Sequence, residues 1–350
     1  MNAVRAAACS LGFAVALAML AGGGPAVAYE LATSWPDADV AMGFTALDVT
    51  FPSHSPFAVA DVGGGPDDDP ATQTQARLVL PPGASAAKPV PAVVLLHGAS
   101  GVLEVREMTY ARQFAALGVA ALVVDVYGAR RDHADDFIGR LLAITEAMFL
   151  ADAFAALDHL AGRPEIDARR VALIGFSYGG IVATLAAFEQ VAERYAPDGT
   201  RFAAHVAFYA PCLATFEDAR ATGAPLLMLY GGRDASVDAG RCAEVADQIT
   251  AGGGRVETVV YPEAVHQWDG RFDGPRPIGR NLAECRLEVE RDGTVRDTLT
   301  HLPMSNGLFR RIILALCTDG DGYLIGHDDT VRARSNLDMG RFLAAVFAGP

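Results

Sequence analysis

The chain has 350 residues, of which 51% are hydrophobic and 20% charged, and its formal net charge at pH 7 is −14. This composition is typical of a globular protein with a large core and excludes a generally disordered chain. The acidic balance disfavours nucleic acid and anionic membrane surfaces, because both attract clustered Lys and Arg. We therefore expect no nucleic-acid partner.

The N-terminus has the pattern of a secretory signal peptide. Arg5 supplies a positive charge, residues 11–20 are apolar, and the small residues 26–28 form a cleavage site before Tyr29. We predict that residues 1–28 are removed and that the protein is exported to the periplasm or the extracellular space. The alternative is a membrane anchor, but the apolar run is shorter than the ~20 residues that span a bilayer. No other stretch predicts a stable membrane span.

Cleavage would leave four cysteines, Cys212, Cys242, Cys285 and Cys317. This even number suits disulfides in an oxidising compartment. We favour pairing between sequence neighbours, Cys212 with Cys242 and Cys285 with Cys317, and the alternative is four buried thiols. Their separation and the lack of a Cys-x-x-Cys motif disfavour a zinc site, so no metal is expected.

Residues 29–88 predict an N-terminal segment whose strands, at 44–51 and 75–80, form an antiparallel edge of the following sheet. From residue 89 onward, strands and helices alternate. Strands are predicted at 93–96, 119–126, 171–174, 205–209, 226–230 and 256–261, and helices at 103–117, 138–160, 181–193 and 236–251. The alternation predicts one doubly wound α/β domain with a mostly parallel sheet over residues 89–350.

Residues 270–335 fit this alternation less well, because they are rich in Arg, Gly and Asp and contain two of the cysteines. We predict that they form a disulfide-tied excursion over the C-terminal face of the sheet. A last helix is predicted at 337–347.

One stretch organises the rest of the chain. At 171–180 an apolar run of strand length ends in Gly-x-Ser-x-Gly and passes directly into a helix-like segment. This context predicts a nucleophile elbow, whose glycines tolerate the strained turn and the close approach of strand and helix. Ser177 is therefore the predicted nucleophile. The alternative is an ordinary strand-to-helix turn.

A serine nucleophile needs a base within hydrogen-bond reach, and the base needs an acidic partner. In this architecture the order along the chain is Ser, acid, His. Asp234 follows one predicted strand and His266 follows the next, so they are the predicted acid and base. Asp238 is an alternative acid, and His301 and His327 are other histidines of the irregular tail.

The tetrahedral intermediate places a negative charge on the former carbonyl oxygen, which requires fixed N–H donors. We predict that the backbone N–H of Tyr178 is one donor of this oxyanion hole. The second comes from the loop after the first parallel strand, with Ala99 preferred and Ser100 the alternative. His97 is expected to hold this loop.

Five motifs in this order resemble a dienelactone hydrolase of the α/β-hydrolase superfamily over about residues 75–270. They are His-Gly-Ala-Ser-Gly at 97–101, Asp-Val-Tyr-Gly-Ala-Arg at 125–130, Gly-Phe-Ser-Tyr-Gly-Gly at 175–180, Gly-Gly-Arg-Asp at 231–234 and the loop of His266. The resemblance implies an α/β-hydrolase fold and hydrolysis of an ester or lactone through an acyl-enzyme, without a metal or organic cofactor.

The resemblance also implies that Arg130, or its neighbour Arg131, binds a substrate carboxylate. The alternative is a surface arginine that answers nearby acidic residues. The dienelactone hydrolases that name the group carry a cysteine nucleophile, whereas this chain has Ser177. An ordinary carboxylesterase is therefore favoured over the named lactone substrate.

The sequence thus predicts an exported serine hydrolase that cleaves an ester or lactone of a small molecule. The alternatives are an acetyl-ester or polyester hydrolase or a peptidase of the same fold, and a binding protein without catalysis. Acyl size and oligomeric state depend on the shape of surfaces and pockets, which residue spacing leaves open.

Overall fold

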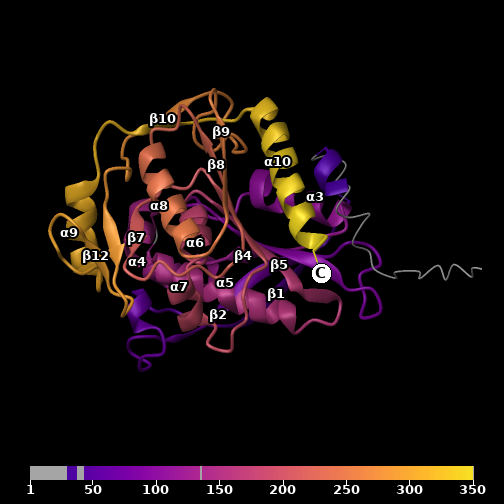
Figure 1. Ribbon diagram of the computed structural model, residues 1–350, viewed down its shortest axis with the longest axis horizontal. Coiled ribbons are helices and arrows are strands. Elements are labelled where there is room, and N and C mark those ends of the chain that lie inside the picture. Colours follow the sequence, from indigo (N-terminus) through magenta and orange to yellow (C-terminus); the bar gives the residue numbers. More distant parts are fainter. Residues whose placement is uncertain (1–29, 38–42, 135, 350) are drawn as a thin grey trace, which may run out of the picture.

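A computed structural model describes residues 30–37, 43–134 and 136–349, so the predicted signal peptide lies outside the described residues. An eight-stranded sheet crosses the centre of the molecule in the order β1-β2-β4-β3-β5-β6-β8-β9 (Figure 1). Its strands are β1 (Ala46–His54), β2 (Ala71–Val79), β3 (Val90–Leu96), β4 (Ala120–Asp125), β5 (Ile166–Phe176), β6 (Ala204–Phe208), β8 (Leu226–Gly231) and β9 (Val256–Tyr261).

The sheet is mostly parallel, which confirms the predicted fold class. Strands β1 and β2 pair antiparallel, and β2 pairs antiparallel with β4. From β4 to β9 every neighbouring pair is parallel. The N-terminal segment thus forms the antiparallel edge of a doubly wound sheet.

Helices cover both faces of the sheet. The helices of the chain include η1 (Val59–Asp61), η2 (Glu104–Met108), α3 (Thr109–Ala116), η3 (Gly128–His133), α4 (Phe137–Ala143), α5 (Glu146–Ala161), α6 (Tyr178–Leu185), α7 (Glu189–Tyr195), α8 (Ala239–Ala251), α9 (Gly307–Cys317) and α10 (Asp329–Phe347). Helices α3 and α10 lie on one side, and α5, α6 and α8 lie on the other (Figure 1).

The wholly apolar sequence of β3 follows from this two-sided cover. Val94 and Leu96 face the core beneath α5 and α6, whereas Val93 and Leu95 face the core beneath α3 and α10. Within the part of the chain that the structure describes, no helix is long and apolar enough to cross a membrane.

The helix predicted at 138–160 is in fact two helices, α4 and α5. Ile144 and Thr145, between them, have extended backbone, and Ile144 is fully buried. The Ile144 carbonyl accepts a hydrogen bond from the hydroxyl of Tyr178. Burial of Ile144 therefore outweighs the continuous helical pattern, and the separate helix α4 packs against α9 and η3. The stretch predicted as a helix at 181–193 is likewise divided into α6 and α7.

Residues beyond β9 form two small sheets and helix α9. Strands β10 (Arg276–Ile278) and β13 (Tyr323–Ile325) pair antiparallel. Strand β11 (Leu287–Val289) pairs antiparallel with β12 (Val295–Asp297) and parallel with β7 (Ala214–Phe216). Two disulfides join described residues, Cys212–Cys242 and Cys285–Cys317, which is the pairing favoured from the sequence.

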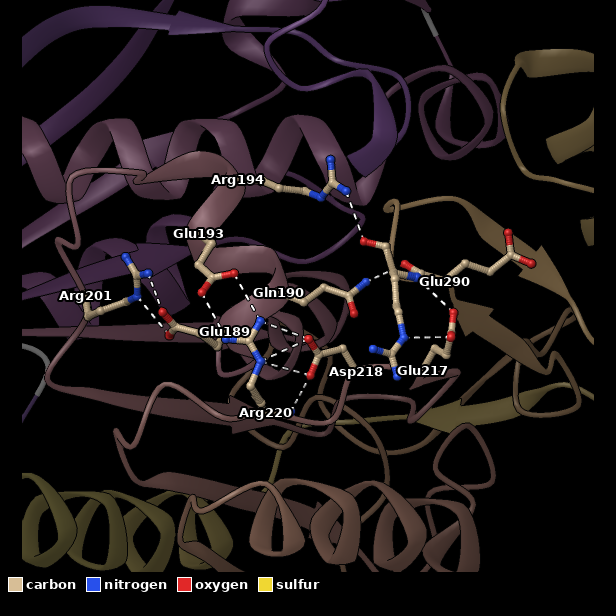
Figure 2. A network of polar contacts seen from close by, with 10 residues as sticks. Glu189, Gln190, Glu193, Arg194, Arg201, Glu217, Asp218, Arg220 and Glu290 are labelled. Carbon is tan, nitrogen blue, oxygen red and sulfur yellow. Dashed lines mark hydrogen bonds and ion pairs between the residues drawn. The ribbon is translucent and has the colours of Figure 1, made fainter.

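A network of polar contacts fastens the β11–β12 turn to the body of the molecule (Figure 2). From α7, Gln190 donates to the carbonyl of Glu290 and Arg194 donates to the carbonyl of Arg291. Arg291 in turn pairs with Glu217, next to β7. The contacts to Arg291 are exposed and each contributes little alone, but together they join three separate segments of the chain.

Candidate active site

Ser177 lies at a strained turn between β5 and α6. Its φ is +53°, a value that non-glycine residues rarely adopt, and its N–H donates to the carbonyl of Phe208 over 2.9 Å. The flanking glycines are required by space, because a Cβ on Gly175 would lie 1.9 Å from the Gly179 carbonyl oxygen. A Cβ on Gly179 would lie 2.5 Å from the carbonyl oxygen of Leu96. The pentapeptide thus has the geometry expected of a nucleophile elbow.

Hydrogen bonds join Ser177, His266 and Asp234 in one line. His266 Nε2 lies 2.9 Å from Ser177 Oγ, and His266 Nδ1 donates to Asp234 Oδ2 over 2.7 Å. The imidazole and the carboxylate are almost fully buried, whereas Ser177 is partly accessible. The structure therefore brings together the three side chains that the sequence singled out from three separate loops.

Ser236 is a fourth member of this cluster and was missed by sequence reasoning. Its hydroxyl donates to Asp234 Oδ1 over 2.6 Å, and its Oγ lies 3.0 Å from His266 Nδ1. The Ser236 N–H also donates to Asp234 Oδ1. A serine two residues after an aspartate is a common turn pattern, so the sequence contained a weak signal for it.

The C-terminal excursion holds the loop that carries His266. The N–H of His266 donates to the carbonyl of Leu324, and its own carbonyl accepts from the N–H of Gly326. The rings of Tyr323 and Tyr209 lie edge-on to the imidazole, with centroids 5.0 and 4.8 Å away. Burial, together with the charge of Asp234, raises the pKa of Tyr323 to about 12, so this ring stays neutral beside the imidazole.

The alternative acid Asp238 and the tail histidine His327 lie in other arrangements. Asp238 accepts a hydrogen bond from the N–H of Arg241 at the start of α8 and pairs with Arg286. His327 pairs with Asp329 instead of with a serine. Their contacts are those of a helix cap and a surface ion pair.

A cavity of about 330 Å³ opens beside Ser177, and Ala99 and Tyr178 line it with His266. The loop after β3 approaches the elbow closely, since a Cβ on Gly98 would lie 3.4 Å from that of Ser177. His97 is buried behind this loop, and its Nδ1 donates to the Gly98 carbonyl over 2.8 Å. Burial lowers the pKa of His97, which favours the neutral ring. The loop that contains Ala99 and the first residue of α6 therefore meet at Ser177.

The predicted role of Arg130 in binding a substrate carboxylate is wrong. Arg130 is only 1% exposed, and its guanidinium pairs with Asp152 on α5 at 2.6 Å. Its remaining donors go to Ser55 and to the carbonyls of Val126 and His54. Because these contacts occupy the guanidinium, Arg130 is a buried structural residue, and not a surface residue either.

The arginines that line the cavity beside Ser177 are Arg280 and Arg311, both exposed. Neither belongs to the motifs of the sequence analysis. Both come from the C-terminal excursion, where the alternation of strands and helices had ended.

A mostly parallel sheet with helices on both faces, and an elbow serine in line with a histidine and an aspartate, define the α/β-hydrolase class. Residues 75–275, more than half of the chain, match the dienelactone hydrolase family. The chain belongs to this family, which confirms the resemblance found in the sequence. It is accordingly a hydrolase that acts on ester bonds.

Two relatives illustrate the match. A Salmonella typhimurium protein named "Putative carboxymethylenebutenolidase" is 28% identical over 202 residues, which cover 52% of this chain and 69% of that protein. A Methylorubrum extorquens protein of the same name is 25% identical over 224 residues, which cover 59% and 70%.

Two solved structures show the fold alone. The dienelactone hydrolase-like promiscuous phosphotriesterase P91 from metagenomic libraries has a TM-score of 0.53 at 20% identity, covering 85% of this chain and 98% of its own. The α/β-hydrolase MGS-M1, from a Medee basin deep-sea metagenome library, has a TM-score of 0.50 at 16% identity, covering 87% and 98%.

Proposed function

We propose that the protein is an exported serine hydrolase that cleaves an ester or lactone of a small molecule through an acyl-enzyme. The observation that carries this proposal is the continuous hydrogen-bond line from Asp234 through His266 to Ser177, which ends in a cavity. A serine hydroxyl is a poor nucleophile alone, and this arrangement supplies both its base and the partner that orients the base.

Each residue has a defined task in the proposed reaction. Ser177 Oγ attacks the substrate carbonyl carbon, and its proton passes to His266 Nε2. Asp234 accepts the Nδ1–H and stabilises the imidazolium that forms. The carbonyl oxygen becomes an anion, which accepts hydrogen bonds from the backbone N–H groups of Tyr178 and Ala99. The first of these lies at the N-terminus of α6, where the helix dipole favours negative charge.

The tetrahedral intermediate then collapses. The carbonyl double bond re-forms while the bond to the alcohol oxygen breaks, and the alcohol leaves with the proton of His266. Water attacks the acyl-enzyme in the same way, with His266 again as the base. The acid product leaves and Ser177 regains its proton.

Turnover of p-nitrophenyl butyrate by the mature chain tests this proposal. The Ser177→Ala variant is expected to lose roughly 10³- to 10⁶-fold in kcat. Ser34→Ala, which removes an exposed hydroxyl from the N-terminal segment, is the matched control and is expected to retain full activity. Circular dichroism checks the fold of both variants. Equal activity of Ser177→Ala and the parent would refute the serine mechanism.

A fluorophosphonate label separates a hydrolase from a binding protein, because it reacts only with an activated serine. Mass spectrometry is expected to find the label on the peptide that contains Ser177. A folded chain that neither turns over the ester nor accepts the label would favour the binding-protein alternative.

Export is proposed from the pattern of residues 1–28 and from two disulfides, which suit an oxidising compartment. N-terminal sequencing of protein recovered outside the cytosol tests it. The expected first residue is Tyr29. Retention of the whole chain in the cytosol, with Met1 in place, would contradict export.

A further inference from the structure

The lining of the cavity beside Ser177 is polar at one end and mostly apolar elsewhere. Its hydrogen-bonding groups at the reacting end belong to Ser177, Ser236, His266 and Tyr323, which lie together. The remainder is mostly aliphatic. Among its described lining residues none is acidic, and the two arginines are exposed. Such a lining disfavours a polar sugar or peptide chain and favours an apolar group next to the reacting carbonyl.

Helix α9 forms one wall of this cavity because its sequence divides into three faces. Arg310, Ile313 and Cys317 face the body of the protein, where the first two are buried. Arg311, Leu314, Ala315 and Thr318 follow the spacing of a second face, and all four line the cavity. The third face, with Leu308, Ile312 and Leu316, is exposed to solvent.

This wall is fixed at two points. Arg310 pairs with Glu146 at the start of α5 over 2.8 Å and also donates to the hydroxyl of Tyr178. At its C-terminal end, α9 is joined through Cys317 to Cys285. The largely buried ion pair and the disulfide therefore fix the distance between α9 and α6, and with it the width of the cavity.

A second wall comes from α4, which packs against α9. Leu141 and Leu142 line the interior, and Ile181 of α6 lines it next to Tyr178. Phe137 and Ile138 also line the cavity but are 40% and 51% exposed, so they form an apolar rim at its mouth. The break of the predicted long helix at Ile144 is what places these side chains here.

The volume exceeds what a small acyl group requires. About 330 Å³ corresponds to space for on the order of ten waters at ~30 Å³ each, and an acetyl group fills only a small part of it. The lining residues of α9, and Leu282, lie outside residues 75–275. This part of the cavity therefore belongs to the C-terminal excursion and not to the segment that matches the family.

We infer that the cavity between α4 and α9 is an acyl-binding site, and that the preferred substrates are esters of apolar acyl chains of medium length. The inference rests on the proposed function, because the chain occupies the cavity while Ser177 attacks its carbonyl. Leu314 is the specificity-determining residue at the α9 wall. Each methylene that leaves water for this lining raises kcat/KM several fold.

A series of p-nitrophenyl esters tests this inference. The octanoate has six more methylenes than the acetate and is expected to have a kcat/KM on the order of a thousandfold higher. Leu314→Trp fills the cavity and is expected to lower this octanoate-to-acetate ratio at least about tenfold. Leu316→Trp adds the same ring on the solvent face of the same helix, where Leu316 is 62% exposed, and is expected to leave the ratio unchanged.

Binding of octanoate to the Ser177→Ala variant, measured by calorimetry, gives a readout that needs no turnover. Hydrolysis of the acetate without preference for the octanoate would overturn the acyl-site inference and leave the proposed function standing. Octanoate binding that Leu314→Trp abolishes, in a chain that hydrolyses no ester, would refute the proposed function and support the cavity assignment. Equal effects of the two tryptophan variants would overturn the role of Leu314.

Discussion

The ion pair between Arg310 and Glu146 determines how firmly α9 is attached, and its removal has a calculable effect. The Arg310 side chain is 4% exposed and the Glu146 side chain 23% exposed. Glu146→Gln leaves the buried guanidinium without its counter-charge, which is expected to lower the free energy of unfolding by about 3–5 kcal/mol. Arg310→Met leaves a carboxylate that still reaches water, so its expected cost is smaller, about 2–3 kcal/mol.

A double-mutant cycle by urea denaturation measures this coupling. The variant with both changes has no unpaired charge, so it is expected to be more stable than the sum of the two single losses predicts. A loss below about 1 kcal/mol for Glu146→Gln, or strictly additive losses, would refute the view that this pair attaches α9.

The same pair predicts the response of stability to acid. Burial alone would raise the pKa of Glu146, but the Arg310 guanidinium lowers it below its ordinary value of 4.5. The unfolded chain therefore binds the proton at a higher pH than the folded one. The contribution of Glu146 is complete above pH 4.5 and is lost as the pH falls through the lowered value. Glu146→Gln is expected to remove this component from the pH profile of unfolding.

Three further predictions concern individual contacts. Ser236→Ala removes hydrogen bonds to Asp234 and His266. In steady-state kinetics this change is expected to lower kcat about five- to tenfold with little change in KM. An unchanged kcat would contradict a positioning role for Ser236. Arg130→Met is expected to lower the free energy of unfolding by about 3–5 kcal/mol, because it leaves Asp152 without its partner. It is not expected to raise KM for a carboxylate-bearing ester relative to a neutral one. A selective rise in that KM would restore the substrate-binding role. Cys285→Ser removes a disulfide between residues 32 positions apart. In urea denaturation it is expected to lower the free energy of unfolding by about 3–4 kcal/mol. An unchanged midpoint would show that the disulfide adds no stability.

Local sequence predicted the elbow and the order of its partners because their requirements are local. Gly175 and Gly179 are needed where two backbone segments approach within van der Waals distance, and the pentapeptide itself indicates this requirement. The positions of Asp234 and His266 follow from the parallel order of β8 and β9, whose carboxyl ends meet at one edge of the sheet. These are the parts of the site that spacing and topology determine together.

What the sequence did not predict depends on contacts between distant segments. Arg130 follows the family motif, but its partner Asp152 lies on the other side of the α4–α5 break, and only folding brings the two together. The hydrogen bonds of His266 with Leu324 and Gly326 join segments about sixty residues apart, and no periodic pattern in the sequence predicts them. The break at Ile144 was missed because an apolar residue at that position suits a helix as well as a buried connection.

The excursion is best understood as part of the site and not as a lid that opens over it. It supplies the backbone partners of the His266 loop, the guanidinium that contacts Tyr178 and one wall of the cavity. Movement of α9 away from the site would break a largely buried ion pair and pull on a disulfide-closed segment, a large cost for every turnover. Entry past the exposed rim of Phe137 and Ile138 requires neither movement. We therefore propose that substrate enters from the α4 side while α9 stays in place.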